Sequence, residues 1–261
     1  MDKAKNYIEQ TSSKLVNNNS TTGKIIKAVL VIIAVIIVVF FAKKIYNTYT
    51  DYKNSKPWIL KGTKSASKRM IILQDPSNSN AITLGRSKNE EGGLEFSYIF
   101  WMFIDDWSVK YGQWKHVMHK GNDSSWSLRA PGIWLHPKEN AMRVYMNTFR
   151  DIGEHVDIGN IPINKWFCVS VNVRQKNLDV FINGNLVKRK ELSSLPRQNF
   201  GDLYINSFQG FSGYMSNIRY FDYYISYSEM RDHLNRGPSS MPCVDSNETP
   251  PYLSANWWTN N

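Results

Sequence analysis

The chain has 261 residues, of which 42% are hydrophobic and 13% aromatic, and its formal net charge is +10. This length leaves room for one membrane anchor and one domain of about 150 to 200 residues, which disfavours a second large domain. The two cysteines, Cys168 and Cys243, exclude a scaffold built on several disulfides, and they leave open whether one bridge forms or both thiols stay reduced.

The positive charge is concentrated near the N-terminus. Residues 1–56 hold nine Lys against three acidic residues, which gives +6 and leaves only +4 for the rest of the chain. Lysines that flank an apolar segment meet anionic lipid headgroups. The sequence also has no Arg-rich arm and no zinc-finger spacing. The charge therefore indicates a membrane surface, and we expect no nucleic-acid partner.

The first predicted element, after a polar segment at residues 1–24, is a single transmembrane helix at residues 25–45. A helix of this length spans about 31 Å, which matches the hydrocarbon core of a bilayer. A signal peptide or a buried core helix fits less well, because the apolar run ends at Phe40-Phe41-Ala42-Lys43-Lys44 without a small-residue cleavage site. Three lysines lie in the segment before the helix and four in the segment after it, a difference that favours a cytosolic C-terminal domain only slightly. Residues 46–56 are predicted to form a polar stalk.

Residues 57–238 are predicted to form one all-β domain. Short apolar runs separated by turn residues are typical of an antiparallel sandwich or jelly roll. The predicted strands are Met70–Leu73, Ala81–Leu84, Phe96–Ile104, Lys115–His119, Gly132–Leu135, Met142–Asn147, Trp166–Val173, Leu178–Ile182, Leu203–Ile205 and Gly213–Tyr220.

Three local signals refine this prediction. Alternation in Trp166–Val173 predicts a strand with one apolar face and one exposed polar face that carries Ser170 and Asn172. Asn183-Gly184 predicts a type I′ hairpin turn. Ser226 or Ser228, followed by Glu229, predicts a capped short helix that Gly237-Pro238 ends. Residues 239–261 are predicted to form an extended tail.

The order of these motifs resembles the LamG-like, or concanavalin A-like, jelly-roll superfamily. The resemblance covers Met70 to Arg236 and implies an antiparallel two-sheet sandwich with a short C-terminal helix. The motifs that carry it are Phe96-Ser-Tyr-Ile-Phe-Trp101-Met-Phe-Ile, His119-Lys-Gly121, Trp166-Phe-Cys-Val-Ser-Val-Asn-Val, Leu178-Asp-Val-Phe-Ile-Asn-Gly184-Asn-Leu-Val, Phe211-Ser-Gly213-Tyr-Met-Ser-Asn-Ile-Arg-Tyr220-Phe-Asp and Ile225-Ser-Tyr-Ser-Glu-Met230.

The architecture also resembles membrane-associated virion proteins of large DNA viruses, since an N-terminal anchor precedes a LamG-like domain in a Lys- and Asn-rich chain. This second resemblance implies a minor capsid protein at the inner membrane of a virion.

The residues do not predict catalysis. The superfamily includes β-glucanases, but no strand here carries their Glu-x-Asp-x-Glu pattern, so a glycoside hydrolase is only a remote alternative. His116 and His119 are three apart in a predicted strand, which predicts that they point to opposite faces and cannot bind one metal ion together. We expect no enzyme and no resident cofactor.

Calcium is the metal that the resemblance makes most plausible, because many LamG-like domains bind it at a rim of the sandwich. The candidates are loop residues: Asp105, Asp106, Asn122 and Asp123. The weak candidates for ligand or partner contact are Trp107, Trp126, Trp257 and Trp258.

Anchor, stalk and missing catalytic groups favour a non-enzymatic interaction module that tethers a membrane to a protein layer such as a viral capsid. The alternative is a cell-surface lectin, which would bind glycans through rim loops with or without calcium.

Overall fold

The computed structural model describes residue 6 and residues 21–87, 94–126 and 128–241. The chain divides into two units, Met1–Lys53 and Asn54–Asn261. Cys243, Trp257 and Trp258 lie outside the described residues.

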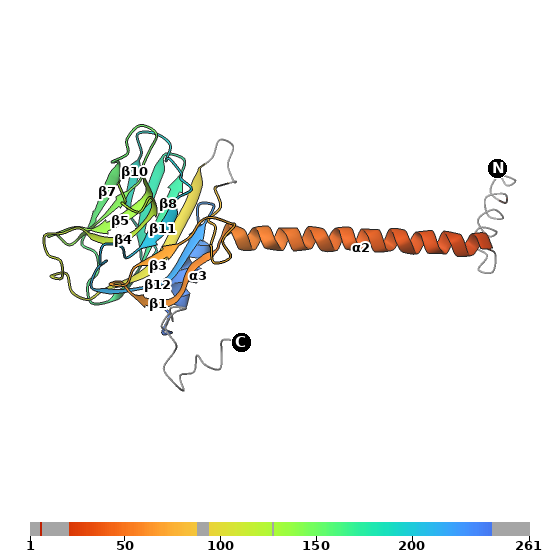
Figure 1. Ribbon diagram of the computed structural model, residues 1–261, viewed down its shortest axis with the longest axis horizontal. Helices are drawn as coiled ribbons and strands as arrows, with labels where there is room; N and C mark the ends of the chain where they lie inside the picture. The colour runs from red at the N-terminus through yellow and green to blue at the C-terminus, as the bar shows by residue number, and fades with distance from the viewer. Residues whose placement is uncertain (1–5, 7–20, 88–93, 127, 242–261) are drawn as a thin grey trace. The chain divides into compact units, whose positions relative to one another are not determined.

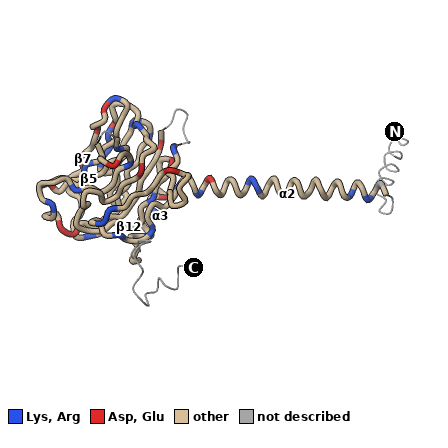
Figure 2. The backbone as a smooth tube through the Cα atoms, viewed as in Figure 1, with Lys and Arg blue, Asp and Glu red and all other residues tan. Residues whose placement is uncertain are grey.

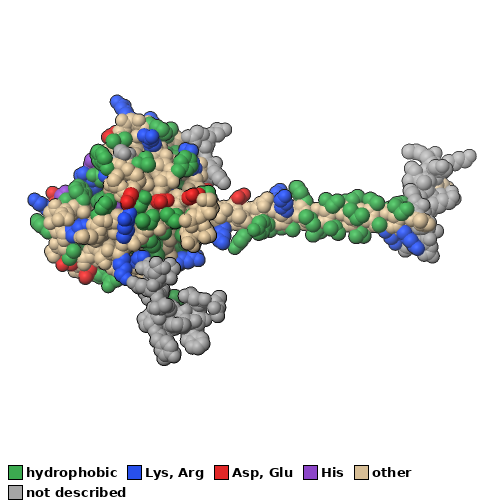
Figure 3. All heavy atoms as spheres, in the orientation of Figure 1, with side chains coloured by type: hydrophobic (Ala, Val, Ile, Leu, Met, Phe, Trp, Pro, Cys, Tyr) green, Lys and Arg blue, Asp and Glu red, His purple; other side chains and the backbone are tan. Residues whose placement is uncertain are grey.

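Helix α2 runs from Thr21 to Ser55, and all but its last two residues belong to the first unit. Its stretch Gly23–Ser55 is long and apolar enough to cross a membrane, and an 18-residue window within it has a mean hydropathy of 3.3. Apolar side chains cover the visible face of the helix (Figure 3), and its uncharged stretch lies between Lys27 and Lys43 (Figure 2). A helix of this length measures about 52 Å, more than the roughly 30 Å of a hydrocarbon core. The helix therefore continues through residues predicted to form the stalk.

The second unit is a sandwich of two six-stranded antiparallel sheets (Figure 1), which confirms the predicted fold class. Sheet A has the order β1-β12-β3-β8-β9-β10, and sheet B has the order β2-β11-β4-β5-β6-β7. The strands of sheet A are β1 (Trp58–Ser65), β3 (Glu95–Ile104), β8 (Trp166–Arg174), β9 (Asn177–Ile182), β10 (Asn185–Glu191) and β12 (Gly213–Phe221). The strands of sheet B are β2 (Met70–Ile72), β4 (Lys115–Gly121), β5 (Arg129–Leu135), β6 (Ala141–Tyr145), β7 (His155–Gly159) and β11 (Asp202–Ile205).

One predicted strand, Ala81–Leu84, is a loop. The buried Gln74 side chain takes the place of a neighbouring strand: its Nε2 donates to the Ile82 carbonyl at 2.9 Å, and its Oε1 accepts from the Leu84 N–H at 3.0 Å. A side chain that satisfies backbone groups in this way competes with sheet pairing.

The core lies between the sheets, and β8 shows how it is built. Phe167, Val169 and Val171 point inward, as the alternation predicts. The prediction that Ser170 and Asn172 are exposed is wrong, because both are buried. Sheet A is sealed on this second face by the chain that follows β12, so the strand is buried on both sides.

The seal is helix α3, Tyr227–Arg236, together with the segment that leads into it. Its Met230 packs with Ile99 and Trp101 in a second apolar cluster on the outer face of sheet A. Ser226 forms a capping box with Glu229, which confirms the predicted cap. The hairpin prediction is also confirmed, since Asn183 and Gly184 both have positive φ, 51° and 81°.

Candidate functional site

The outer face of sheet B carries a row of aromatic and histidine side chains. The row follows directly paired residues across the six strands: Ile71, Tyr204, His119, Gly132, Tyr145 and His155. Directly opposite residues in antiparallel strands share a face, so these side chains point the same way. In the second row, His116 pairs with Trp134, which pairs with Arg143. The face is therefore polar and aromatic where the opposite face of the sheet is apolar.

His116 and His119 lie in contact, so the prediction that they point to opposite faces is wrong. The two rings are joined by Nε2 of His116 and Nδ1 of His119, 2.7 Å apart. The physical reason is a register shift in β4 between His116 and Met118, which breaks the alternation of the strand.

The hydrogen bonds fix the tautomers of both rings. The Ser207 N–H donates to His116 Nδ1 at 2.9 Å, so His116 carries its proton on Nε2 and donates it to His119. His119 then donates from its Nε2 to the Asn122 carbonyl at 2.8 Å. Burial lowers the pKa of His116 well below its ordinary value and also lowers the pKa of His119. The pair is a neutral hydrogen-bonded relay in which all four ring nitrogens have partners.

Arg129, at the start of β5, is the most unusual side chain on this face. It is 8% exposed, and its guanidinium carbon lies 3.5 Å from the ring centre of Tyr145, 5.2 Å from that of Trp126 and 5.4 Å from that of Trp134. Burial lowers the pKa of Arg129, although the guanidinium stays protonated at neutral pH. Aromatic faces attract a cation, but they bring no negative charge to neutralise it.

The other two arginines on this face each have a carboxylate partner. Arg143 makes a bidentate pair with Asp157, with both nitrogen-to-oxygen distances at 2.7 Å. Arg69 pairs with Asp123. Among the described residues, no carboxylate lies within 4.0 Å of the Arg129 guanidinium, and its buried Nε has no hydrogen-bond acceptor. Arg129 is thus the cation on this face whose charge stays uncompensated within the described part of the chain.

Three loops converge beside Arg129 at one end of the sandwich. The Arg197 N–H donates to the Asn147 carbonyl at 2.7 Å, and Asn147 is hydrogen-bonded through both its backbone and its side chain to Arg129. The Phe149 N–H donates to the Leu195 carbonyl at 3.2 Å. These bonds hold the loops at residues 146–154 and 193–201 against each other beside Arg129, and the third loop reaches Arg129 through the ring of Trp126.

Each of these loops exposes one large aromatic side chain. Trp126 is 62% exposed, Phe149 is 71% exposed and Phe200 is 78% exposed, and we refer to these three residues as the aromatic rim. Arg86 lies over the Phe200 ring at 5.5 Å from its centre. Exposed large aromatic side chains beside arginines have the composition of protein interfaces.

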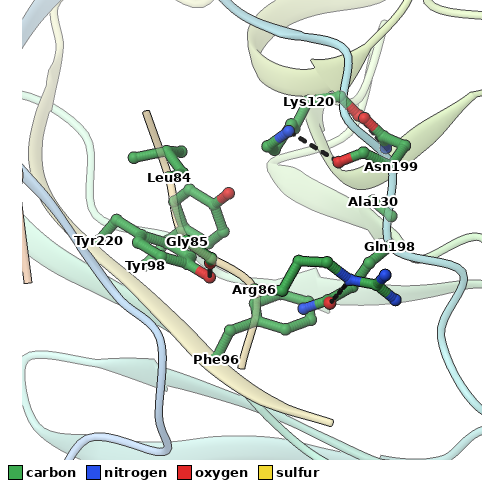
Figure 4. Close-up of a pocket in the computed structure, with 10 residues that line it drawn as sticks. All are labelled: Leu84, Gly85, Arg86, Phe96, Tyr98, Lys120, Ala130, Gln198, Asn199 and Tyr220. Atoms are coloured by element: carbon green, nitrogen blue, oxygen red, sulfur yellow. Dashed lines mark hydrogen bonds between the residues drawn. The ribbon is translucent and has the colours of Figure 1, made fainter. Parts of the chain in front are cut away.

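A small cavity lies between the two sheets at this end (Figure 4). Its volume is about 20 Å³, which fits roughly one water molecule and excludes a sugar ring. The Lys120 ammonium donates to the carbonyls of Asn199 and Gly201, both at 2.8 Å. Burial lowers the pKa of Lys120 to about 8. The residues around the cavity are Leu84, Gly85, Arg86, Phe96, Tyr98, Lys120, Ala130, Gln198, Asn199 and Tyr220.

Three of the four residues predicted for calcium have side-chain contacts within the chain. Asp106 accepts a hydrogen bond from the Ser108 N–H at 2.7 Å, and Asp123 pairs with Arg69. Asn122 donates from its side-chain nitrogen to Ser124, and Asp105 is exposed after β3. Among the described residues, no three His, Cys, Asp or Glu side chains are grouped so that they could hold a metal ion.

The predicted contact tryptophans separate in the structure. Trp107 is half-buried and packs against the core, where the Lys115 ammonium lies 5.2 Å from its ring centre. Trp126 belongs to the aromatic rim. Sequence reasoning missed Arg129, Phe149 and Phe200, although Phe149-Arg150 and Phe200-Gly201 are aromatic residues in turn-rich segments, a pattern that marks exposed loops.

Three carboxylates in the described part of the chain, Glu95, Glu154 and Asp157, hold structural contacts. Glu95 pairs with Arg174, and Asp157 pairs with Arg143. Glu154 accepts hydrogen bonds from Ser193. Each of these groups is committed to a structural contact.

No protein-family model matches the chain, and no curated protein matches it. Solved structures with a similar arrangement include binding domains of botulinum neurotoxins. A botulinum neurotoxin C/D mosaic receptor-binding domain is 11% identical over 54% of this chain and 36% of that chain, with a TM-score of 0.44. An HCR/D W1238A mutant is 12% identical over 70% of this chain and 51% of that chain, with a TM-score of 0.48. The chain thus spans about half or less of the length of these structures.

Proposed function

We propose that this protein is a single-pass membrane-anchored, non-enzymatic interaction module that tethers a bilayer to a protein layer. The observation that carries the proposal is the aromatic rim, three exposed side chains on three loops that meet beside Arg129. Burying a large aromatic side chain at an interface supplies much of the binding energy of protein complexes. Helix α2 supplies the anchor, since its length and composition suit a bilayer.

The protein layer that fits the architecture is a viral capsid, as the resemblance to virion membrane proteins implies. In this setting the chain acts as a LamG-like minor capsid protein. Helix α2 lies in the virion inner membrane, and the rim contacts the capsid protein.

The proposal is tested by separating the two attachments, helix α2 to the lipid and the aromatic rim to the protein layer. When detergent dissolves the membrane of isolated particles, the wild-type chain is expected to sediment with the protein layer. A variant that carries Trp126→Ser, Phe149→Ser and Phe200→Ser is expected to leave with the lipid. Tyr227→Ser is the matched control, because Tyr227 is equally exposed on helix α3. Equal sedimentation of the rim variant and the wild type would contradict the proposal.

A lectin is the second candidate, and the exposed Trp126 favours it because an open indole face can stack on a sugar. The rest of the face argues against it. Tyr204 stacks on His119, and Arg129 lies over Tyr145, so these ring faces are already occupied. A glycan array with and without calcium tests this candidate, and selective calcium-dependent binding would favour it over the tether.

A further inference from the structure

We propose that Arg129 is a receptor for a carboxylate side chain, and that the partner of the aromatic rim therefore presents an acidic Asp or Glu residue at this point. The inference deepens the proposed function and rests on it. It states which class of chemical group pairs with the Arg129 guanidinium.

The first argument is the charge balance of the face. A buried arginine is ordinarily paired with a carboxylate, because an uncompensated charge away from water is costly. Even the less buried arginines on this face have such a partner, since the half-buried Arg143 pairs with Asp157 and the exposed Arg69 pairs with Asp123. Arg129 is more buried than either and has no such partner among the described residues. Among the described residues of this face, Arg129 is therefore the buried arginine without a carboxylate.

The second argument is the geometry that holds the guanidinium in place. The ring of Tyr145 supports it from one side, while Trp126 and Trp134 lie about equally far on other sides. Gly132 makes room for this arrangement, since a Cβ there would lie 2.6 Å from Trp134 Cζ3 and 3.1 Å from the Arg129 Cβ. A guanidinium fixed in this way is pre-organised for a planar, bidentate carboxylate.

The third argument selects a protein over an acidic sugar. On the sheet, the rings of Tyr204 and Trp134 are stacked on His119, so these faces are not open platforms for a pyranose. The exposed groups beside Arg129 are the rim aromatics, which suit an apolar protein surface with one acidic residue in its centre.

The test uses the full chain, labelled with ¹⁵N-arginine, in phosphatidylcholine nanodiscs. Its Nε–H resonances are followed by NMR while three probes are added: a Glu-Gly-Glu peptide with blocked ends, its Gln-Gly-Gln counterpart, and a di-uronate sugar of the same charge. The resonance that disappears in Arg129→Lys identifies Arg129. We expect the Glu peptide to shift this resonance saturably, and the Gln peptide to leave it in place.

Variants give the size of the effect. Arg129→Gln is expected to weaken binding of the Glu peptide at least about tenfold. Arg143→Gln is the control: because Arg143 is already paired with Asp157, its loss should change the affinity less than about twofold. If Arg129→Gln does not fold, Trp126→Ala removes one exposed wall of the site and is expected to weaken binding roughly threefold. A near-ultraviolet circular dichroism spectrum that matches the wild type verifies that a variant is folded.

Three outcomes overturn the inference: no shift of the Arg129 resonance, equal shifts of all arginines on the face, or tighter binding of the sugar than of the peptide. Failure of this inference is distinguishable from failure of the tether. If Arg129→Gln still sediments with the protein layer while the rim variant does not, the acidic contact is wrong and the tether stands. If the rim variant also stays with the layer, the tether itself is wrong, whatever the peptides do.

Discussion

The two outer faces of the sandwich differ in how their side chains are satisfied. On sheet A, the chain covers its own face: helix α3 brings Met230 onto Ile99 and Trp101. On sheet B, the described chain places aromatic rings, a histidine relay and arginines whose charges are paired except at Arg129. A face closed by the chain's own apolar side chains contributes to stability, whereas a face with an unpaired cation is ready for a partner. Four predictions follow from this difference.

The largest effect is expected where sheet A is sealed. Met230→Ala leaves a cavity between helix α3 and the sheet, and we expect it to lower the free energy of unfolding by about 2 to 4 kcal/mol. Urea unfolding of the detergent-solubilised chain measures the change. Arg231→Ala, at the neighbouring exposed position, is the matched control and should stay within about 0.5 kcal/mol. Similar values for both variants would mean that the helix does not seal the face.

Low pH is expected to destabilise the domain through the buried neutral histidines of both sheets. Burial lowers the folded-state pKa of His116 and His119, and it lowers that of His233, on the buried side of helix α3, to about 4. The unfolded chain binds these protons near pH 6.5, so the stability present above that pH is lost as the pH falls towards the folded-state values. We expect a loss of up to about 1.4 kcal/mol per pH unit for each histidine between pH 6.5 and 5.

Urea unfolding at several pH values measures this slope. His233→Gln should reduce it by removing one titrating group, and His119→Gln should reduce it on the sheet B side. A free energy of unfolding that stays flat from pH 7 to 5 would show that the histidines are not held neutral.

A substitution at Gly132 tests how closely the side chains on the outer face of sheet B are packed around Arg129. Gly132→Ala places a methyl group against Trp134 and the Arg129 stem, so we expect a loss of roughly 1 to 3 kcal/mol and a displaced Arg129. Gly159→Ala is the matched control, because a Cβ there meets nothing within 4 Å. Thermal unfolding and the Arg129 Nε–H resonance report the two effects. An unchanged resonance in Gly132→Ala would contradict the packing described for the site.

The smallest effect is expected at the N-terminus of helix α3, which Ser226 caps. Ser226→Ala removes the oxygen that accepts from the Glu229 N–H at 3.2 Å, and should cost about 1 kcal/mol of unfolding free energy. Urea unfolding measures it. Ser228→Ala, within the first turn, is the control, since the cap is Ser226; a larger loss at Ser228 would place the cap wrongly.

Sequence patterns predicted the parts of this molecule that depend on local interactions. The alternation of β8, the Asn183-Gly184 turn and the Ser226 cap each involve residues close in the chain. Strand β10 was only partly visible, because an edge strand with Lys188, Arg189 and Lys190 has no apolar alternation.

The candidate site could not be predicted in the same way. The contact between His116 and His119 depends on a shift in pairing with β5, which no pattern within β4 reveals. The isolation of Arg129 is a property of the whole face, since it follows from where Asp123 and Asp157 lie. Sequence reasoning found Trp126 but could not find the loops that Asn147 holds beside it.

The most direct test of the central claim is photo-crosslinking in intact membranes or particles, with benzoylphenylalanine at position 126 and, as the comparison, at position 227 on helix α3. Mass spectrometry then identifies what each position contacts. The tether predicts one discrete protein adduct at position 126 and no such adduct at position 227, and the inference about Arg129 adds that the adduct maps to an acidic segment. Glycan or lipid adducts at position 126, or equal protein adducts at both positions, would contradict it.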